Sequence, residues 1–200
     1  MIVESIKSYS LFFEPQFREK VSYNVFFREL FKDIDGFYRF SRPFKNHRVN
    51  WIFLNTEDED FVKNLLNKKI GKYTITGIKE RTFPMPLPKD KIVTLRYITL
   101  SPIVLRGRGG RYITAKDISY FQNKIRKLTG AEKVFVDLKY YEKHKDRVVK
   151  IIKDIPNRKP FPATVIPFSV KGNRKVHEYI WYRGIGILPE WGFGFVELNF

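Results

Sequence analysis

The sequence predicts an α+β protein made of two successive domains. Segments with alternating apolar residues interchange with segments of helical periodicity, and a proline-rich stretch divides the chain near its middle. Hydrophobic residues make up 43% of the 200 positions, which is enough for buried cores. We expect a first domain over residues 1–83, a linker over 84–90 and a second domain over 91–200.

The first half of the chain has a regular order of elements. Ser22 is suited to cap a helix whose apolar residues recur at helical spacing until Gly36, and Thr56 is suited to cap a second helix that begins with four acidic residues. The predicted order is strand, helix, strand, strand, helix, strand, over residues 2–13, 22–35, 36–44, 49–54, 56–69 and 73–78. This β-α-β-β-α-β order is that of a ferredoxin-like (RRM-like) domain, with two helices on one face of an antiparallel sheet.

The second half repeats this order less regularly. Its linker carries three prolines within five residues, which makes it stiff and unable to continue a β-ladder. Thr114 is suited to cap a helix that ends at Gly130. Further elements are expected as a strand over 93–104, a strand over 133–140, a charged helix over 142–155, and extended segments over 164–170 and 179–187. Because little chain remains between Lys171 and Gly184, we expect no complete second helix there.

The charge of the chain points to a polyanionic partner. Lys and Arg total 38 against 21 Asp and Glu, a formal net charge of +17. Nucleic acid is favoured over a membrane, because the sequence has neither a basic amphipathic helix nor a long apolar run. A merely cationic thermophilic enzyme is the alternative, but there both signs of charge are expected to rise together.

Several classes of chemistry have no support in the sequence. The chain has no cysteine, which removes disulfides, thiolate nucleophiles and cysteine-based zinc sites. It shows no paired-histidine metal motif, no phosphate-binding loop and no nucleophile elbow. We therefore expect neither metal nor cofactor, and we expect a cytoplasmic protein because no signal peptide or membrane span is apparent.

Glycines near the C-terminus form the most distinctive pattern. Gly184 and Gly186 make one G-x-G pair, and Gly192 and Gly194 make a second pair five residues later. Glycine is required where the backbone takes a positive φ or where another group must come close. The pattern therefore predicts either a tight structural turn or a loop that a ligand approaches, followed by a strand through Phe193, Phe195 and Glu197.

This glycine pattern, together with an L-S-P-I signature at residues 100–103 in a basic chain, resembles the sixth CRISPR-associated (Cas) protein family. These proteins are endoribonucleases of the RAMP group that process CRISPR repeat transcripts. The resemblance implies two ferredoxin-like domains with RNA in the cleft between them, and a glycine-rich loop that contacts the RNA backbone. Where many members carry Lys, Arg or Ser within the loop, this chain has the apolar segment 187–191, in which Trp191 either stacks on a base or packs inward.

The resemblance also implies metal-independent cleavage. In the family the ribose 2′-OH attacks the adjacent phosphorus and leaves a 2′,3′-cyclic phosphate, a reaction that needs a base, an acid and a cation. The family places its histidine near the first helix, but residues 22–35 contain none. The candidate catalytic set is therefore the nearest histidine with its neighbours, namely His47, Tyr38, Lys45 and Arg48, with Arg42 as a further cation. The candidate RNA-binding residues are Arg106, Arg108, Arg111, Arg174, Lys175, His177, Arg183, Gly184, Gly186, Gly192 and Gly194.

Two functions remain open at this point. One is an endoribonuclease that cuts precursor CRISPR RNA, which His47 close to Tyr38 favours. The other is a non-catalytic RNA-binding relative, either a paralogue or a subunit of a CRISPR effector complex, which the missing helix histidine favours. In both cases the expected partner is a CRISPR repeat transcript, and the protein is expected to act as a homodimer or beside effector-complex subunits.

Overall fold

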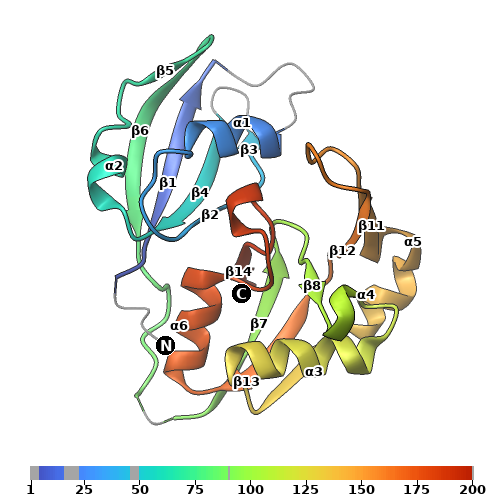
Figure 1. The fold of residues 1–200 in the computed structure, drawn as a ribbon. Coiled ribbons are helices and arrows are strands. Elements are labelled where there is room, and N and C mark those ends of the chain that lie inside the picture. Colours follow the sequence, from blue (N-terminus) through green and yellow to red (C-terminus); the bar gives the residue numbers. More distant parts are fainter. Residues whose placement is uncertain (1–4, 16–22, 46–49, 90, 200) are drawn as a thin grey trace.

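The computed structural model describes residues 5–15, 23–45, 50–89 and 91–199. They form two large antiparallel sheets, each with helices on one face, and two small two-stranded sheets; the two large sheets lie one above the other in Figure 1. The first sheet uses residues 7–81 and the second uses 93–198. Both follow the β-α-β-β-α-β order, so the expected pair of ferredoxin-like domains is confirmed.

The first domain has the strand order β2-β4-β1-β6-β5, with the short β3 also paired to β4. Its elements are β1 (Lys7–Glu14), α1 (Tyr23–Leu30), β2 (Tyr38–Phe40), β3 (Phe44–Lys45), β4 (Asn50–Thr56), α2 (Glu59–Lys63), β5 (Lys69–Ile70) and β6 (Tyr73–Arg81). Alternate residues of β1 and β4 pack against α1 in a core that is rich in phenylalanine, where Phe13 and Phe27 meet edge to face at 5.7 Å.

The second helix of this domain is shorter than predicted. It is capped by Asp58, whose carboxylate accepts from the backbone N–H of Phe61 at 2.8 Å, and not by Thr56. Thr56 instead accepts from the N–H of Asp58 at 3.1 Å. The helix ends at Lys63, and the chain then turns through Asn67, whose φ of 62° interrupts any helix. The predicted helix over 56–69 is therefore wrong at both ends.

The second domain has the strand order β10-β13-β7-β14. Its ferredoxin-like elements are β7 (Val93–Thr99), α3 (Ile118–Thr129), β10 (Lys133–Val136), β13 (Phe168–Gly172), α6 (Arg174–Arg183) and β14 (Val196–Leu198). Two insertions interrupt this order, together with a 3₁₀ turn before β14. They comprise β8 (Leu105–Arg106), η1 (Arg108–Gly110), β9 (Tyr112–Ile113), α4 (Leu138–Lys143), α5 (Lys145–Val148), β11 (Val149–Ile152), β12 (Phe161–Thr164) and η2 (Pro189–Trp191).

The structure corrects the prediction that the second domain has no complete second helix. Asn173 caps α6 by accepting from the N–H of Val176 at 3.2 Å, and the helix runs for ten residues to Gly184, where φ is 65°. Val176, Ile180 and Trp181 are buried along one side of this helix. The predicted extended segment over 179–187 is therefore wrong in its first half, because residues 179–183 are helical.

Three other boundaries in this domain differ from the sequence prediction. The N-cap of α3 is Asp117 rather than Thr114, whereas the predicted end at Gly130 is confirmed by its φ of 73°. Strand β10 stops at Val136, because Asp137 caps α4. The predicted helix over 142–155 is wrong beyond α5, since the β-branched run from Val148 to Ile152 favours the strand β11.

Within the described ranges, every helix is too short or too polar to cross a lipid bilayer.

Candidate nucleic-acid interface

The glycine segment, residues 184–194, lies at the junction of the two domains. It leaves α6, passes through η2 and leads toward β14, and η2 packs against β2 and α1 of the first domain (Figure 1). The glycines near the C-terminus are therefore positioned by contacts with the first half of the chain.

Arg39 of β2 reaches into this segment from the first domain. Its side chain is buried, and its two terminal nitrogens donate to the carbonyl oxygens of Gly194 at 2.9 Å and Gly186 at 3.0 Å. Burial lowers the pKa of Arg39 to about 9, so the guanidinium remains charged at neutral pH. A buried cation is costly unless dipoles surround it, and the planar fork of arginine matches two carbonyl groups at once. Arg39 thereby ties the glycine segment to the first sheet.

The glycines are required because this packing leaves no room for side chains. A Cβ at Gly194 would overlap the carbonyl oxygen of Ile185, and a Cβ at Gly192 would overlap the ring of Phe40. Both glycines also have a φ near 72°, which side-chain-bearing residues adopt only at a cost.

Most backbone N–H groups of the segment donate to carbonyl oxygens within the protein. Gly184 donates to Ile180 O at 2.9 Å, Gly192 to Pro189 O at 2.9 Å, and Gly194 to Pro102 O at 2.8 Å. The acceptor Pro102 belongs to the L-S-P signature, so the two motifs meet in space. Gly184, Gly192 and Gly194 were candidate RNA-binding residues, but each of their N–H groups already has an acceptor within the protein.

Other polar pairs strengthen the junction between the domains. Arg183, a predicted RNA contact, forms an ion pair with Glu57 at 3.1 Å instead. Asn55 donates to the C-terminal carbonyls of α6, at 2.9 Å to Trp181 and 2.7 Å to Tyr182. These contacts satisfy carbonyl groups that the end of a helix leaves open.

Trp191 packs inward, which decides between the two alternatives for this residue. Its side chain is only 6% exposed, and the guanidinium of Arg28 on α1 lies 4.2 Å from the centre of its ring. This cation–π contact adds to the junction between the domains.

The three predicted arginines at 106, 108 and 111 lie together on the β8–η1–β9 hairpin, and we call them the arginine hairpin. All three are exposed. Arg106 lies over the ring of Tyr112 at 5.0 Å and donates to its hydroxyl at 3.0 Å. Gly109 and Gly110 at the tip both have positive φ. The hairpin concentrates positive charge in a form that phosphates can reach.

A second group of cations includes residues of both domains, and the sequence analysis had named only Arg42 among them. Lys150 on β11 has its pKa lowered by partial burial and by the positive charges of Arg42 and Arg147. Arg42 follows β2 in the first domain, whereas Arg147 lies on α5 in the second. We call Arg42, Arg147 and Lys150 the interdomain cluster. Because Arg42 is distant in sequence from Arg147 and Lys150, no local sequence pattern connects these cations. Only the overall positive charge of the chain indicated an anion-binding site.

The structure describes only part of the predicted catalytic set. His47 and Arg48 lie outside the described residues, and only the backbone of Lys45 is described. Lys45 pairs with Asn50 at one end of β4, and Tyr38 pairs with Thr56 at the other end. These ends are six residues apart, about 20 Å along a strand. The structure therefore does not bring Tyr38 and Lys45 together.

Tyr38 packs at the junction between the domains. It is half-buried, and its hydroxyl donates to Glu190 O at 3.5 Å. Burial raises the pKa of Tyr38, with a smaller contribution from the charge of Glu190, so the phenol is less able to lose a proton at neutral pH. This position does not suit a general base.

His177 is a core residue, which corrects its assignment as an RNA contact. The side chain has no exposed surface, Nδ1 lies 2.8 Å from the hydroxyl of Tyr97, and Nε2 lies 3.3 Å from Val93 O. Arg174 and Lys175, which sequence reasoning placed beside it, are exposed at the start of α6, where Arg174 pairs with Glu178 at 2.6 Å. The ten residues of α6 separate these cations from the glycine segment by about 15 Å.

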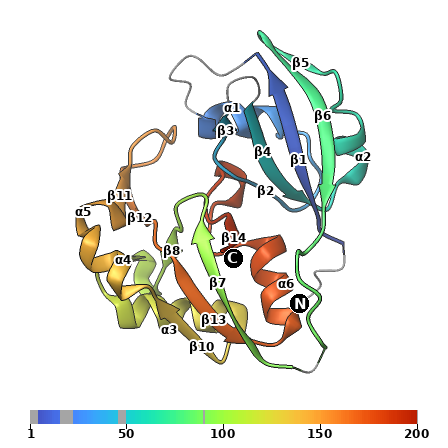
Figure 2. The same ribbon diagram turned by 180° about the vertical axis from the view of Figure 1, so that it is seen from behind.

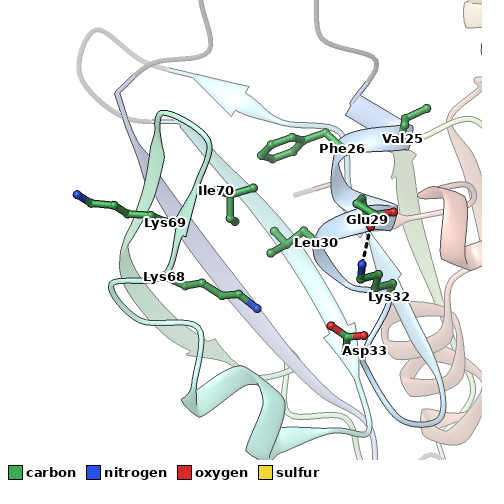
Figure 3. Close-up of a pocket in the computed structure, with 9 residues that line it drawn as sticks. All are labelled: Val25, Phe26, Glu29, Leu30, Lys32, Asp33, Lys68, Lys69 and Ile70. Carbon is green, nitrogen blue, oxygen red and sulfur yellow. Dashed lines mark hydrogen bonds and ion pairs between the residues drawn. The ribbon is translucent and has the colours of Figure 1, made fainter.

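A separate apolar pocket of about 580 Å³ lies between α1 and β5. Figure 3 shows Phe26, Leu30 and Ile70 along its apolar part, and the ion pair between Glu29 and Lys32 at 2.7 Å on the helix side. Neither basic group contributes to this pocket. Among the described residues, no three His, Asp or Glu side chains gather as they would around a metal ion.

Comparison with known proteins places this architecture in a family. Residues 84–198 match the family model described as CRISPR associated protein Cas6, C-terminal. Because this match spans more than half of the 200 residues, the chain belongs to the Cas6 family. No curated protein matches the sequence.

Similar solved structures share the fold over nearly the whole chain. One described as CRISPR associated protein Cas6 has a TM-score of 0.64 at 14% identity, covering 98% of this chain and 100% of its own. One described as a RAMP protein binding different RNA substrates has a TM-score of 0.62 at 17% identity, covering 97% and 100%. A Cas6-related protein from Pyrococcus furiosus has a TM-score of 0.61 at 16% identity, covering 97% and 98%.

Proposed function

We propose that this protein binds CRISPR repeat RNA through the arginine hairpin and the interdomain cluster. The observation that carries the proposal is the position of Lys150: partial burial lowers its pKa, and the positive charges of Arg42 and Arg147 lower it further. Neighbouring like charges destabilise one another, and an anion that binds among them relieves the repulsion. A phosphate backbone supplies such anions at regular spacing.

The surroundings of these cations support a nucleic acid over a small anion. The arginine hairpin adds exposed guanidinium groups on the same domain as Arg147 and Lys150. The net charge of +17 exceeds what a single small ligand requires. A protein with the same fold is described as binding different RNA substrates, and membership of the Cas6 family makes the repeat transcript the natural choice.

We further propose that the protein cleaves this RNA without a metal, by attack of the 2′-OH to give a 2′,3′-cyclic phosphate. His47, between the paired residues Lys45 and Asn50, is the candidate acid or base, and Lys45 and Arg48 are the candidate cations. The alternative is a family member that holds RNA as part of a larger complex without cutting it. The burial of Tyr38 and His177 favours this alternative, because it removes two of the proton-transfer groups that the sequence offers.

Labelled repeat RNA incubated with the protein in EDTA separates the two activities. A single cut with a cyclic phosphate end is expected, and the His47→Ala variant should keep its RNA affinity while single-turnover cleavage falls by about 10²–10⁴-fold. His144→Ala is the matched control and should cut normally. Tight binding without any cut, across a panel of repeat sequences, would establish the binding-only alternative.

A further inference from the structure

The first sheet has a face that its helices do not cover. Figure 1 shows α1 on one side of this sheet, and Figure 2 shows the sheet from behind. Side chains alternate along a strand, and Tyr9, Leu11 and Phe13 of β1 enter the core beneath the helices. Phe12 of β1 therefore points to the uncovered face.

Aromatic residues of the neighbouring strand point to the same face. On β4 the core residues are Ile52 and Leu54, so Trp51 and Phe53 lie on the uncovered side. Phe12 and Trp51 are direct partners in the antiparallel register of β1 and β4. Direct partners of this kind have their Cβ atoms about 5 Å apart, so the two rings are neighbours.

The strand on the other side of β1 leaves room for the ring of Phe12. Its partner there is Gly77, and a Cβ at Gly77 would lie 3.3 Å from a ring carbon of Phe12. Lys79, two residues further along β6, is exposed and lies opposite Ser10. A partly exposed pair of aromatic rings thus has a cation beside it.

Phe53 serves a different purpose from the other two aromatic residues. The guanidinium of Arg81 lies 3.7 Å from the centre of its ring, and Phe195 lies 6.0 Å away, so Phe53 belongs to the junction between the domains. Phe12 and Trp51 lie further along the sheet and are both partly exposed.

The second sheet provides an internal comparison. Its central strands β7 and β13 place Tyr97 and Phe168 in the core. The opposite face of these strands carries Arg96, Ser169 and Lys171, which are polar or charged. Two ferredoxin-like domains of the same topology therefore differ in their uncovered faces: the central strands present Phe12 and Trp51 there in the first domain, but Arg96, Ser169 and Lys171 in the second.

We propose that Phe12 and Trp51 form a base-stacking platform for single-stranded RNA. Every base has a flat π-face that stacks on aromatic rings, and four-stranded sheets of this topology bind single strands through aromatic residues on their two central strands. The net charge of +17 and the nearby Lys79 favour RNA over a protein partner. The inference rests on the proposed RNA binding, and it adds a contact that recognises bases rather than phosphates.

Replacement of the rings tests the platform. Phe12→Leu and Trp51→Leu keep apolar bulk but remove the π-face, and Phe135→Leu on β10, where the native ring is 48% exposed, is the matched control. The probes are a short oligouridine strand and an abasic strand of the same length. Each platform variant should lose about 5- to 150-fold in affinity for oligouridine, as expected for one base stack. Affinity for the abasic strand and the salt dependence should not change, and Phe135→Leu should bind as the native protein does.

A measurement on the native protein covers the case in which a variant fails to fold. Trp181 and Trp191 are only 2% and 6% exposed, so fluorescence quenching by RNA reports mainly on Trp51. Oligouridine should quench this fluorescence, and the abasic strand should not. Equal affinity for both strands without quenching would overturn the platform and leave this face to a protein partner. Failure to bind either strand, or repeat RNA, would instead overturn the proposed RNA-binding function.

Discussion

His177 illustrates how a residue chosen for its chemistry can serve the core instead. The carbonyl of Val93 can only accept a hydrogen bond, so Nε2 carries the proton and Nδ1 accepts from the hydroxyl of Tyr97. This arrangement satisfies the neutral imidazole completely. Burial is the main cause that lowers the pKa of His177, and it outweighs the opposing backbone hydrogen bonds at Val93 and Gly172.

The lowered pKa of His177 predicts a dependence of stability on pH. The unfolded chain binds a proton near pH 6.5, whereas the folded chain binds it only at lower pH. The free energy of unfolding should therefore decrease as the pH falls below about 6.5 and level off below the folded pKa. Thermal unfolding between pH 7.5 and about 5 measures this effect, and His177→Gln should flatten the dependence. An unchanged slope in the variant would show that other groups cause it.

At the scale of elements, the glycine segment packs at the junction of the two domains and stabilises it. Gly194→Ala places a methyl group against Ile185 O and also strains a positive φ. Gly109→Ala is the matched control, because Gly109 has a φ of 65° but no atom within 4 Å of the added carbon. We expect the control to lose about 1 kcal/mol from strain alone, and Gly194→Ala to lose clearly more. Thermal unfolding of both variants checks this, and equal losses would mean that no close packing exists at Gly194.

The elements show which parts of the fold are predictable from sequence. The order of elements in the first domain follows from apolar periodicity, whereas the predicted cap Thr56 is replaced by Asp58 and Ser22 lies outside the described residues. Helix α6 was missed because the chain between Lys171 and Gly184 was judged too short for a complete helix, although Asn173 and Gly184 mark its two ends and Val176 and Ile180 have helical spacing. Strand β11 was missed although its β-branched residues favour a strand locally.

At the scale of the whole molecule, the junction between the domains lies beyond sequence reasoning. In the sequence Arg39 is one of many basic residues, yet in the structure its side chain is buried against carbonyl groups more than 140 positions away. The interdomain cluster likewise combines residues from both domains. Such contacts depend on how two sheets pack, which no local pattern encodes. Most N–H groups of the glycine segment donate to acceptors within the protein, which the sequence pattern did not indicate.

The affinity of the protein for labelled repeat RNA, measured over a range of salt concentrations, tests the central claim most directly. Log affinity should fall linearly with log salt, with a slope of about 0.7 for each single-strand phosphate neutralised. Each of three variants replaces a group of three cations by glutamine. The first variant changes the arginine hairpin and the second changes the interdomain cluster. The control changes Arg126, Lys127 and Lys133, which are exposed on α3 and β10. Each of the first two should reduce the slope by about 2, and the control should not. Affinity that does not depend on salt, or slopes that are the same in all three variants, would contradict the account.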